Sequence, residues 1–290
     1  MLREFAVEPD ALSSWNNCRL VLDRFVMGSG AVLSEYPKRW KRMVYECASS
    51  QCHGIELTRI VESLKGLDRR ITIPSRREFP DSGQDWIGKA VSAHQKIPFG
   101  GIVCAKDEHA VLGVGVIPVS EVGATHPLFV GLGQAHVTRD SLAMVEAVAL
   151  LLREATHVKF VDAHYKPGGH TGFDGPIKAL LEQIRVGGEQ RITVELHTES
   201  SDRRPLEEIL EEGFVRLVKE VMPIAEIVVV FYPHGSLHNR FLLTDRGGVM
   251  WGTGLDEQGA SSNKTDSDDL FLLNEKLFEL HWKKWIRSPG

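Results

Sequence analysis

From residue 157 onward, short apolar runs alternate regularly with amphipathic segments, and this pattern constrains the fold more than any other feature of the chain. The runs VKFVDAHY, RITVELHT and EIVVVFYP are rich in β-branched residues, whereas DGPIKALLEQI and LEEILEEGFVRLVKEV, between them, have helical spacing. FLLTD and GGVMWGTGL follow as strand-like runs, and LFLLNEKLFELHWKKWI closes as a helix. Strands that alternate with helices predict an α/β sheet covered by helices.

The chain before residue 150 has a different texture. Residues 1–70 carry apolar positions at helical spacing, and the polar, proline-containing residues 71–90 favour a loop or a boundary. FGGIVCA and AVLGVGVIPV then predict strands, and SLAMVEAVALLLREA predicts a buried helix. We therefore expect a helical and α+β region at residues 1–150, for substrate or partner docking, and an α/β domain with a mixed sheet and flanking helices at residues 151–290.

The charge balance gives no sign of a general affinity for nucleic acid or membranes, because the net charge is only −5. Residues 1–150 carry 17 basic and 17 acidic side chains, and residues 151–290 carry 17 basic and 22 acidic ones. A phosphate site in the second part therefore needs local positive charge or help from the first part.

The cysteines and the apolar segments bear on cofactors and location. A zinc site needs about four ligands at supportive spacing, and the chain has no second cysteine pair, so we expect reduced thiols and neither metal nor cofactor. The four residues are Cys18, Cys47, Cys52 and Cys104. The first residues lack the apolar stretch of a signal peptide, and no window has the length of a membrane span, so we expect a cytoplasmic protein.

The most informative segment is SLHNRFLLTDRGGVMWGTGLDE. In this segment His238 comes two residues before Arg240, Asp245 follows five residues later, and Gly252 and Thr253 come after six further residues. Positions two apart on a strand face the same way, so we expect His238 and Arg240 to project from one strand. Arginine binds phosphate oxygens with paired hydrogen bonds, and histidine can attack phosphorus or move protons. The pattern therefore predicts a phosphate site.

This spacing resembles the motif of the phospholipase D superfamily, which is His-x-Lys, four residues, Asp, six residues, and then Gly-Ser or Gly-Gly. The similarity covers about residues 155–290, where VKFVDAHYKP resembles the opening strand of a phospholipase D-like half-domain. The resemblance implies that His238 is the nucleophile and forms a phosphohistidine. It also implies that Arg240 and Thr253 hold the non-bridging oxygens, and that Asp245 orients the nucleophile.

Two positions depart from the superfamily pattern: its lysine is Arg240 here, and its asparagine falls on Leu255. The chain resembles still more closely the phospholipase D-like domain that ends eukaryotic MIT-domain proteins. The matching stretches are His238-Asn239-Arg240, Asp245-Arg246-Gly247 and Gly252-Thr253-Gly254-Leu255-Asp256. Those eukaryotic domains resemble non-enzymatic membrane-binding modules, whereas related domains of prokaryotic conflict systems are regarded as nucleases.

Two functions therefore stay open. One is a metal-independent phosphodiesterase, in particular a nuclease of a prokaryotic antiphage defence system, acting through His238. The other is a catalytically inactive module that binds nucleic acid, anionic lipid or a partner protein; Arg240 discriminates, because lysine would favour the enzyme. The chemistry needs two histidines and the chain has one motif, so we expect a homodimer that pairs two copies of His238. The expected partners are nucleic acid, with DNA favoured, and an NTPase of the same defence operon.

Further substrate contacts are expected at the end of the motif, from Gly252, Thr253 and Asp256. The loop PGGHTGFDG also places His170 near Lys166 after the first strand, where open α/β sheets bind ligands. An exposed loop histidine without a role is an equal alternative for His170. Two other histidines are expected to be structural: His197 and His281.

The segment KRWKR interleaves four basic residues with an aromatic one. Such a patch can bind a nucleic-acid backbone, which makes Lys38, Arg39, Lys41 and Arg42 candidate nucleic-acid ligands. The alternative is a solvated helix face with Trp40 buried.

Overall fold

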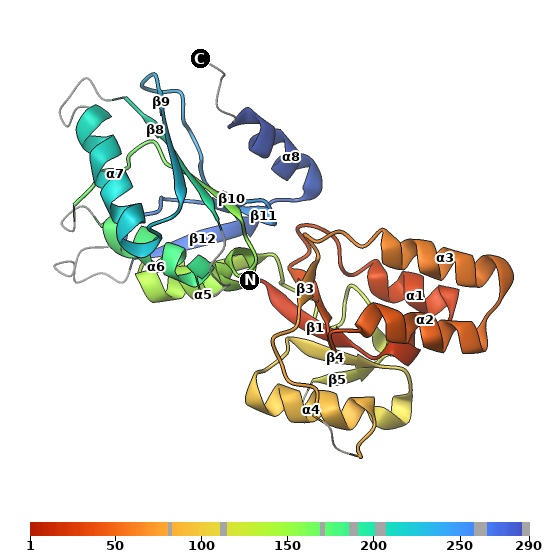
Figure 1. Ribbon diagram of the computed structural model, residues 1–290. Helices are drawn as coiled ribbons and strands as arrows, with labels where there is room; N and C mark the ends of the chain where they lie inside the picture. The colour runs from red at the N-terminus through yellow and green to blue at the C-terminus, as the bar shows by residue number, and fades with distance from the viewer. Residues whose placement is uncertain are drawn as a thin grey trace. The chain divides into compact units, whose positions relative to one another are not determined.

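The computed structural model describes residues 1–80, 83–110, 115–168, 172–185, 191–200, 207–257 and 266–285. It confirms the α/β class, because two sheets are each flanked by helices (Figure 1). The chain divides into an N-terminal unit, Arg3–Leu132, and a C-terminal unit, Gly133–Gly290 together with Met1–Leu2. The division comes before residue 150 because the strand and helix that follow Gly133 belong to the second sheet and its core.

The N-terminal unit is built on a five-stranded parallel sheet with the order β3-β2-β1-β4-β5. Its strands are β1 (Arg3–Val7), β2 (Ala31–Glu35), β3 (Thr72–Pro74), β4 (Gly101–Cys104) and β5 (Val116–Pro118). Residues 1–70, which were expected to be helical, therefore also contain β1 and β2. These strands are short apolar runs without alternation, since the sheet is covered on both faces, and they do not stand out from the helical spacing around them.

Helices cover both faces of this sheet (Figure 1). On one face lie α1 (Trp15–Leu22), α2 (Trp40–Gln51) and α3 (Gly54–Lys65), and on the other lies α4 (Trp86–Lys96). Short 3₁₀ helices occupy Pro9–Leu12, Asp107–His109 and Val119–Glu121. The side chains of Ser14 and Asp85 accept backbone hydrogen bonds at the starts of α1 and α4, which fixes where these helices begin.

The C-terminal unit is built on a seven-stranded mixed sheet with the order β6-β12-β11-β10-β7-β8-β9. Its strands are β6 (Gln134–Thr138), β7 (His157–Val161), β8 (Thr193–Glu199), β9 (Glu226–Tyr232), β10 (Arg240–Thr244), β11 (Gly247–Trp251) and β12 (Ser267–Leu272). β7, β8 and β9 are parallel, and the remaining neighbours pair antiparallel. The mixed sheet expected for this part of the chain is confirmed.

Helices α5 (Ser141–Leu152), α6 (Asp174–Arg185) and α7 (Glu207–Val221) cover one face of the mixed sheet, and α8 (Glu275–Lys284) lies on the other (Figure 1). The first face holds an apolar core in which Phe160, Leu196 and Phe214 are fully buried. None of the helices that the structure describes is long and apolar enough to cross a membrane. The four cysteines are free thiols.

Candidate functional site

The motif residues of the C-terminal unit meet where β7, β8 and β9 end, and we call this side of the sheet the carboxyl edge. Because β10 runs antiparallel to β7, its first residue, Arg240, lies at the carboxyl edge. Arg240 pairs with Trp251, the last residue of β11, so Gly252 and Thr253 follow directly beside it. The topology therefore brings a guanidinium and the glycine-containing loop after β11 together, as an anion site requires.

His238 lies in the connection between β9 and β10, and its side chain is exposed. Strand β10 begins at Arg240, so the expectation that both residues project from one strand is wrong. The reason lies one residue earlier: Leu237 is buried, and its N–H donates to the Glu199 carboxylate at 2.6 Å. The N–H before His238 is therefore bonded to a side chain and does not pair with a neighbouring strand. His238 nevertheless lies at the carboxyl edge, two residues before Arg240.

Glu199, the last residue of β8, organises this connection from a buried position. Its second oxygen lies 3.2 Å from Nδ1 of His234, and His164, in the loop after β7, adds a favourable electrostatic interaction. Burial alone would raise the pKa of Glu199, but the loop N–H groups, that of Leu237 above all, and the two histidines outweigh it and lower the pKa. Two histidines thus lie near this carboxylate, and its other oxygen holds the backbone of the residue before His238.

A second buried carboxylate, Asp162, lies directly after β7 and close to Arg240. Asp162 is 1% exposed and accepts hydrogen bonds from the N–H groups of His164, at 2.9 Å, and Leu255, at 3.0 Å. It therefore joins the loop after β7 to the loop after β11. Burial raises the pKa of Asp162, while these N–H groups and the charge of Arg240 act in the opposite direction.

Arg240 itself keeps hydrogen-bonding capacity for a ligand. Its side chain is half-buried, and its Nε atom is buried without a hydrogen-bond partner in the described part of the chain. A buried donor without a partner costs roughly 1–3 kcal/mol. An anion bound at the carboxyl edge would remove this cost.

Asp245 lies at the opposite end of β10 from Arg240. A strand rises about 3.3 Å per residue, which separates the two Cα atoms by roughly 16 Å. The Asp245 carboxylate accepts hydrogen bonds from the N–H and hydroxyl of Thr156, at 2.9 and 2.8 Å, and from the N–H of His157, at 3.3 Å. It therefore joins the β10–β11 turn to the start of β7, and within one chain it does not orient His238.

The loop after β11 is held by side chains of the same unit. The N–H of Thr253 lies 3.1 Å from both oxygens of Asp268, and the Thr253 side chain is exposed. A Cβ at Gly252 would come within 2.5 Å of Oδ1 of Asp268, so glycine permits this close approach. Asp256 forms an ion pair of 2.6 Å with Arg139. Among the described residues of this loop, Thr253 has an exposed side chain that could contact a ligand, whereas the ion pair of Asp256 fixes the loop.

The loop after β7 contributes further residues. Lys166 is exposed in this loop, and His170 lies outside the described residues. Sequence reasoning gave no role to Asp162, Glu199 and His164. A signal for the first two was present, because each carboxylate comes at the end of a buried run, VKFVD or TVELHTE. Burying a carboxylate costs free energy unless it has a specific hydrogen-bond or charge partner, so an acidic residue at this position indicates such a partner.

A second polar group, which we call the Glu195 cluster (Glu195, His157, Lys159 and His197), lies beneath α8. One Glu195 oxygen lies 2.7 Å from Nε2 of His197 and 3.5 Å from Nζ of Lys159, and the other lies 2.5 Å from Nε2 of His157. Lys159 also donates to the carbonyl of Trp285, at the end of α8. Burial opposes ionisation of Glu195, yet the two histidines and Lys159 lower its pKa. His197 is fully buried here, which confirms its structural assignment.

In the N-terminal unit, the basic segment KRWKR surrounds the start of α2. Trp40 is fully buried, and its Nε1 donates to a carbonyl at the end of β1 at 2.6 Å, so this aromatic belongs to the core. Lys41 and Arg42 form ion pairs with glutamates of the same unit, at 3.0 and 2.7 Å. Lys38 and Arg39 are exposed. The segment therefore combines a core tryptophan with two cations whose side chains have no ion-pair partner among the residues that the structure describes.

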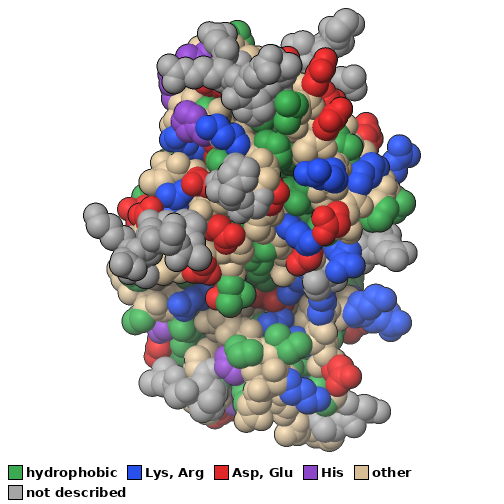
Figure 2. Space-filling view, turned by 90° about the vertical axis from the view of Figure 1, so that its left-hand side faces the viewer, with side chains coloured by type: hydrophobic (Ala, Val, Ile, Leu, Met, Phe, Trp, Pro, Cys, Tyr) green, Lys and Arg blue, Asp and Glu red, His purple; other side chains and the backbone are tan. Residues whose placement is uncertain are grey.

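Charge is mixed rather than segregated over the face drawn in Figure 2, where basic and acidic side chains are interspersed. This face therefore has no broad positive surface. In the described ranges, no group of three His, Cys, Asp or Glu residues has an arrangement that could hold a metal ion.

Neither family models nor curated protein sequences match this chain. Among solved structures, the archaeal chromatin protein TrmBL2 is similar over 52% of this chain and 50% of its own, with 13% identity and a TM-score of 0.28. Two structures of yeast tyrosyl-DNA phosphodiesterase are similar over 48% of this chain and 32% of theirs, with 8% identity and a TM-score of 0.24. The similarity therefore extends over about half of this chain and over half or less of the length of those structures.

Proposed function

We propose that the C-terminal unit binds a phosphodiester at the carboxyl edge and cleaves it without a metal ion through His238. One observation carries the proposal: the fold brings His238, Arg240 and Thr253 to one edge of the sheet, and Arg240 has a buried donor without a partner among the described residues. Phosphoryl transfer through a covalent intermediate needs a nucleophile and groups that stabilise charge on the phosphate oxygens, and a histidine with a guanidinium and a hydroxyl supplies both.

The proposed reaction has two displacements. A ring nitrogen of His238 attacks phosphorus, the bond to the leaving oxygen breaks, and a general acid gives that oxygen a proton. Water then attacks the phosphohistidine, the same group takes the proton from water, and His238 is released. Arg240 and Thr253 stabilise the charge on the non-bridging oxygens, and Asp162 keeps Arg240 and the two adjoining loops in position.

The general acid can come from this chain or from a second copy. His164 and His234 both lie near Glu199, whose other oxygen fixes the residue before His238. Either of them would supply the second histidine within one subunit. The alternative is the expected homodimer, in which a second copy of His238 protonates the leaving oxygen.

For the substrate we propose nucleic acid, with DNA favoured, held in addition by the basic segment of the N-terminal unit. Lys38 and Arg39 support this part of the proposal, because their side chains are exposed and form no ion pair with the described part of the unit. A role as a nuclease of a prokaryotic antiphage defence system, together with an NTPase, rests on the sequence resemblance alone.

A second candidate function is a binding module that has lost catalysis. The observation in its favour is Arg240, which stands where the phospholipase D superfamily has lysine. A guanidinium binds phosphate by paired hydrogen bonds whether or not the bond is then broken. The same carboxyl edge would then hold nucleic acid, anionic lipid or a phosphorylated partner.

The deciding experiment is incubation of the full chain with end-labelled single- and double-stranded DNA and RNA in EDTA. His238→Ala is the test variant and His136→Ala is the matched control, because His136 is an exposed histidine on β6 that pairs with Asp269. We expect cleavage by wild type and by the control but none by His238→Ala. Cleavage by His238→Ala at the wild-type rate would exclude the phosphohistidine. Binding without cleavage by any variant would select the binding module.

A further inference from the structure

A cavity of about 370 Å³ lies on the N-terminal unit, between the start of α2 and the segment after β3. Its lining residues are Pro37, Lys38, Arg39, Arg42, Met43, Glu46 and Phe79. The strands of this sheet are parallel, and both the β2–α2 connection and the segment after β3 leave from their carboxyl ends. Open α/β sheets bind ligands at this side.

The cavity has an excess of positive charge. Three cations and one carboxylate line it, and the carboxylate, Glu46, pairs with Arg42 at 2.7 Å. The side chains of Lys38 and Arg39 have no hydrogen-bond or ion-pair partner within the described residues. These cations lie at the start of α2, where the helix dipole is positive and cations are unfavourable. An anion in the cavity would reverse this unfavourable arrangement.

The opposite wall of the cavity is apolar and fixed in place. Phe79 is half-buried, with its ring 5.5 Å from that of Tyr36 in an edge-on arrangement and 4.7 Å from Nζ of Lys89. The Tyr36 hydroxyl lies 3.2 Å from the carbonyls of Glu78 and Lys89, which ties the segment that carries Phe79 to α4. Together with Met43, this ring offers a flat apolar surface beside the two cations.

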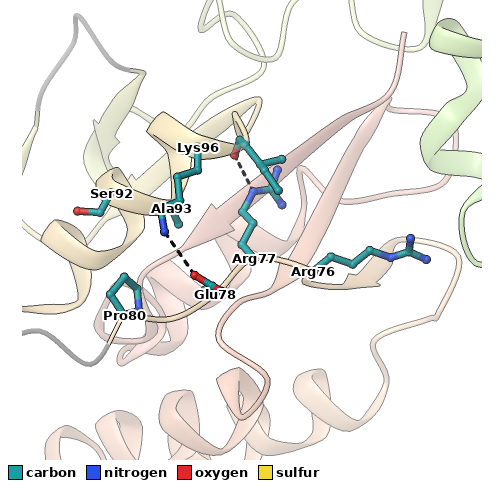
Figure 3. Close-up of a pocket in the computed structure, with 8 residues that line it drawn as sticks. Arg76, Arg77, Glu78, Pro80, Ser92, Ala93 and Lys96 are labelled. Atoms are coloured by element: carbon teal, nitrogen blue, oxygen red, sulfur yellow. Dashed lines mark hydrogen bonds and ion pairs between the residues drawn. The ribbon is translucent and has the colours of Figure 1, made fainter. Parts of the chain in front are cut away.

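A neighbouring cavity of about 310 Å³ lies near the same segment, and it includes basic side chains that already have partners within the protein (Figure 3). Its lining includes Arg77 and Lys96, but both are already bound by the protein. Arg77 donates to the carbonyls of Ile97 and Pro98, at 2.8 and 2.7 Å, and Lys96 lies 3.3 Å from Glu78. Of these two cavities, the first is therefore the one lined by Lys38 and Arg39, whose side chains have no partner among the described residues.

We infer that the first cavity binds one nucleotide of a single nucleic-acid strand, with its phosphate at Lys38 and Arg39 and its base against Phe79 and Met43. A volume of this size suits a nucleotide rather than a helical stack. A base can reach an apolar wall only when it is unstacked, which selects a single strand over a duplex. The substrate class rests on the proposed function, whereas the residues of the subsite lie entirely in the other unit.

The test is binding of a fluorescent oligonucleotide to the full chain, measured by anisotropy with His238→Ala as the background so that nothing is cleaved. Phe79→Ala should weaken single-strand binding by about five- to a hundredfold and leave duplex binding unchanged. Lys38→Glu with Arg39→Glu should weaken binding at least tenfold. Lys96→Glu is the matched control, a charge reversal in the neighbouring cavity, and should change little.

Equal losses from Lys96→Glu and Lys38→Glu/Arg39→Glu would overturn the inference, since general charge repulsion would then explain both. An unchanged affinity of a well-folded Phe79→Ala variant for single strands would overturn it as well. Thermal unfolding shows whether each variant is folded. If alanine disturbs the segment, Phe79→Leu replaces it, because leucine keeps the bulk without the aromatic face and should also weaken single-strand binding. Cleavage by the unmodified chain is scored separately, so failure here and failure of the proposed function remain distinguishable.

Discussion

The carboxylate of Glu199 accepts a hydrogen bond of 2.6 Å from the backbone N–H of Leu237, the residue directly before His238. Asp162, directly after the neighbouring strand β7, has the corresponding role and accepts hydrogen bonds from the N–H groups of His164 and Leu255. Each loop of the proposed site is therefore held by a buried carboxylate at the end of a parallel strand. Because Glu199 and Asp162 have pKa values shifted in opposite directions, they give the site two separable responses to acid.

Glu199→Gln should destabilise the C-terminal unit at neutral pH and reduce cleavage. Hydrogen bonds to an ionised group stabilise by about 1.5–3 kcal/mol, and glutamine keeps the shape without the charge. Since the pKa of Glu199 is lowered by folding, its contribution is full above the unfolded-state pKa and is lost as pH falls through the folded-state pKa. Urea unfolding at several acidic pH values measures the difference from wild type. A difference that does not shrink in acid, or an equal effect of Glu226→Gln, an exposed control, would contradict this account.

Asp162→Asn should produce the opposite pH response. Burial raises the pKa of Asp162, so the folded protein binds its proton more tightly, and stability falls as pH rises from the unfolded-state pKa through the folded-state pKa. Asparagine has no proton to lose, so this decline should disappear in urea unfolding curves over the same range. Cleavage should fall too, because one amide oxygen cannot replace the two carboxylate oxygens that hold the loops of His164 and Leu255. A variant with wild-type pH dependence would refute the assignment.

Arg240→Ala should lower kcat/KM by roughly 30- to 900-fold, the equivalent of about 2–4 kcal/mol for one lost charge-stabilising donor. Arg240→Lys keeps the charge but not the paired hydrogen bonds, so a site adapted to arginine should lose a smaller part of its activity. Both are measured in EDTA on the substrate that wild type cleaves. Higher activity of the lysine variant would instead indicate that the site originally used lysine and lost activity when arginine replaced it.

Asp245→Ala should affect stability and spare chemistry. The carboxylate satisfies N–H groups at the start of β7, and its removal should cost about 1–3 kcal/mol of unfolding free energy. The folded fraction should cleave within a few-fold of wild type, since Asp245 lies at the far end of β10 from Arg240. If the variant lost all activity while its unfolding free energy stayed unchanged, Asp245 would instead act on His238, for example on that of a partner subunit.

Sedimentation of the purified chain should show a homodimer if a second copy of His238 is the general acid. Mixing wild type with His238→Ala should then reduce activity more than in proportion, because mixed dimers lack one of the two histidines. A fully active monomer would contradict the dimer and assign the proton to His164 or His234. Single His164→Gln and His234→Gln variants, compared for their alkaline pH limits, identify which one acts.

The sequence predicted the order of strands and helices between residues 157 and 251, because each element there has its own period of apolar residues. It missed β12, since LFLL was assigned to the closing helix, whereas Leu270–Leu272 end this strand and α8 begins only at Glu275. It also placed His281 in the packing of the last helix, where its ring lies 4.3 Å from that of Phe241. The strands β1 and β2 were missed, since buried parallel strands carry no alternation to detect. For them, only the pairing of residues far apart in the chain separates strand from helix.

The motif predicted which residues share the carboxyl edge but not how they are held. The spacing from Arg240 to Asp245 looks compact in the sequence, yet an extended strand places the two residues at opposite ends. Glu199 and Asp162 were given no role: their positions at the ends of buried runs indicate that each has a specific partner, but the sequence does not show that these partners include the N–H groups of Leu237 and Leu255. Trp40 is buried, as one of the two alternatives for its segment expected, but its hydrogen-bond partner lies at the end of β1, a strand that the sequence did not reveal.

The Glu195 cluster bears on how α8 moves. Lys159 donates to the carbonyl of Trp285, and its own pKa is lowered by burial, although Glu195 acts against this. If the helix moved a small distance away, the ammonium group would lose the Trp285 carbonyl before water could replace it and would keep only its ion pair with Glu195, which is less favourable than either end state. Intermediate positions of α8 are therefore disfavoured, and the helix leaves the sheet as a whole or stays. Its amide protons should accordingly exchange with solvent together, in one cooperative opening, rather than by gradual fraying toward the sheet.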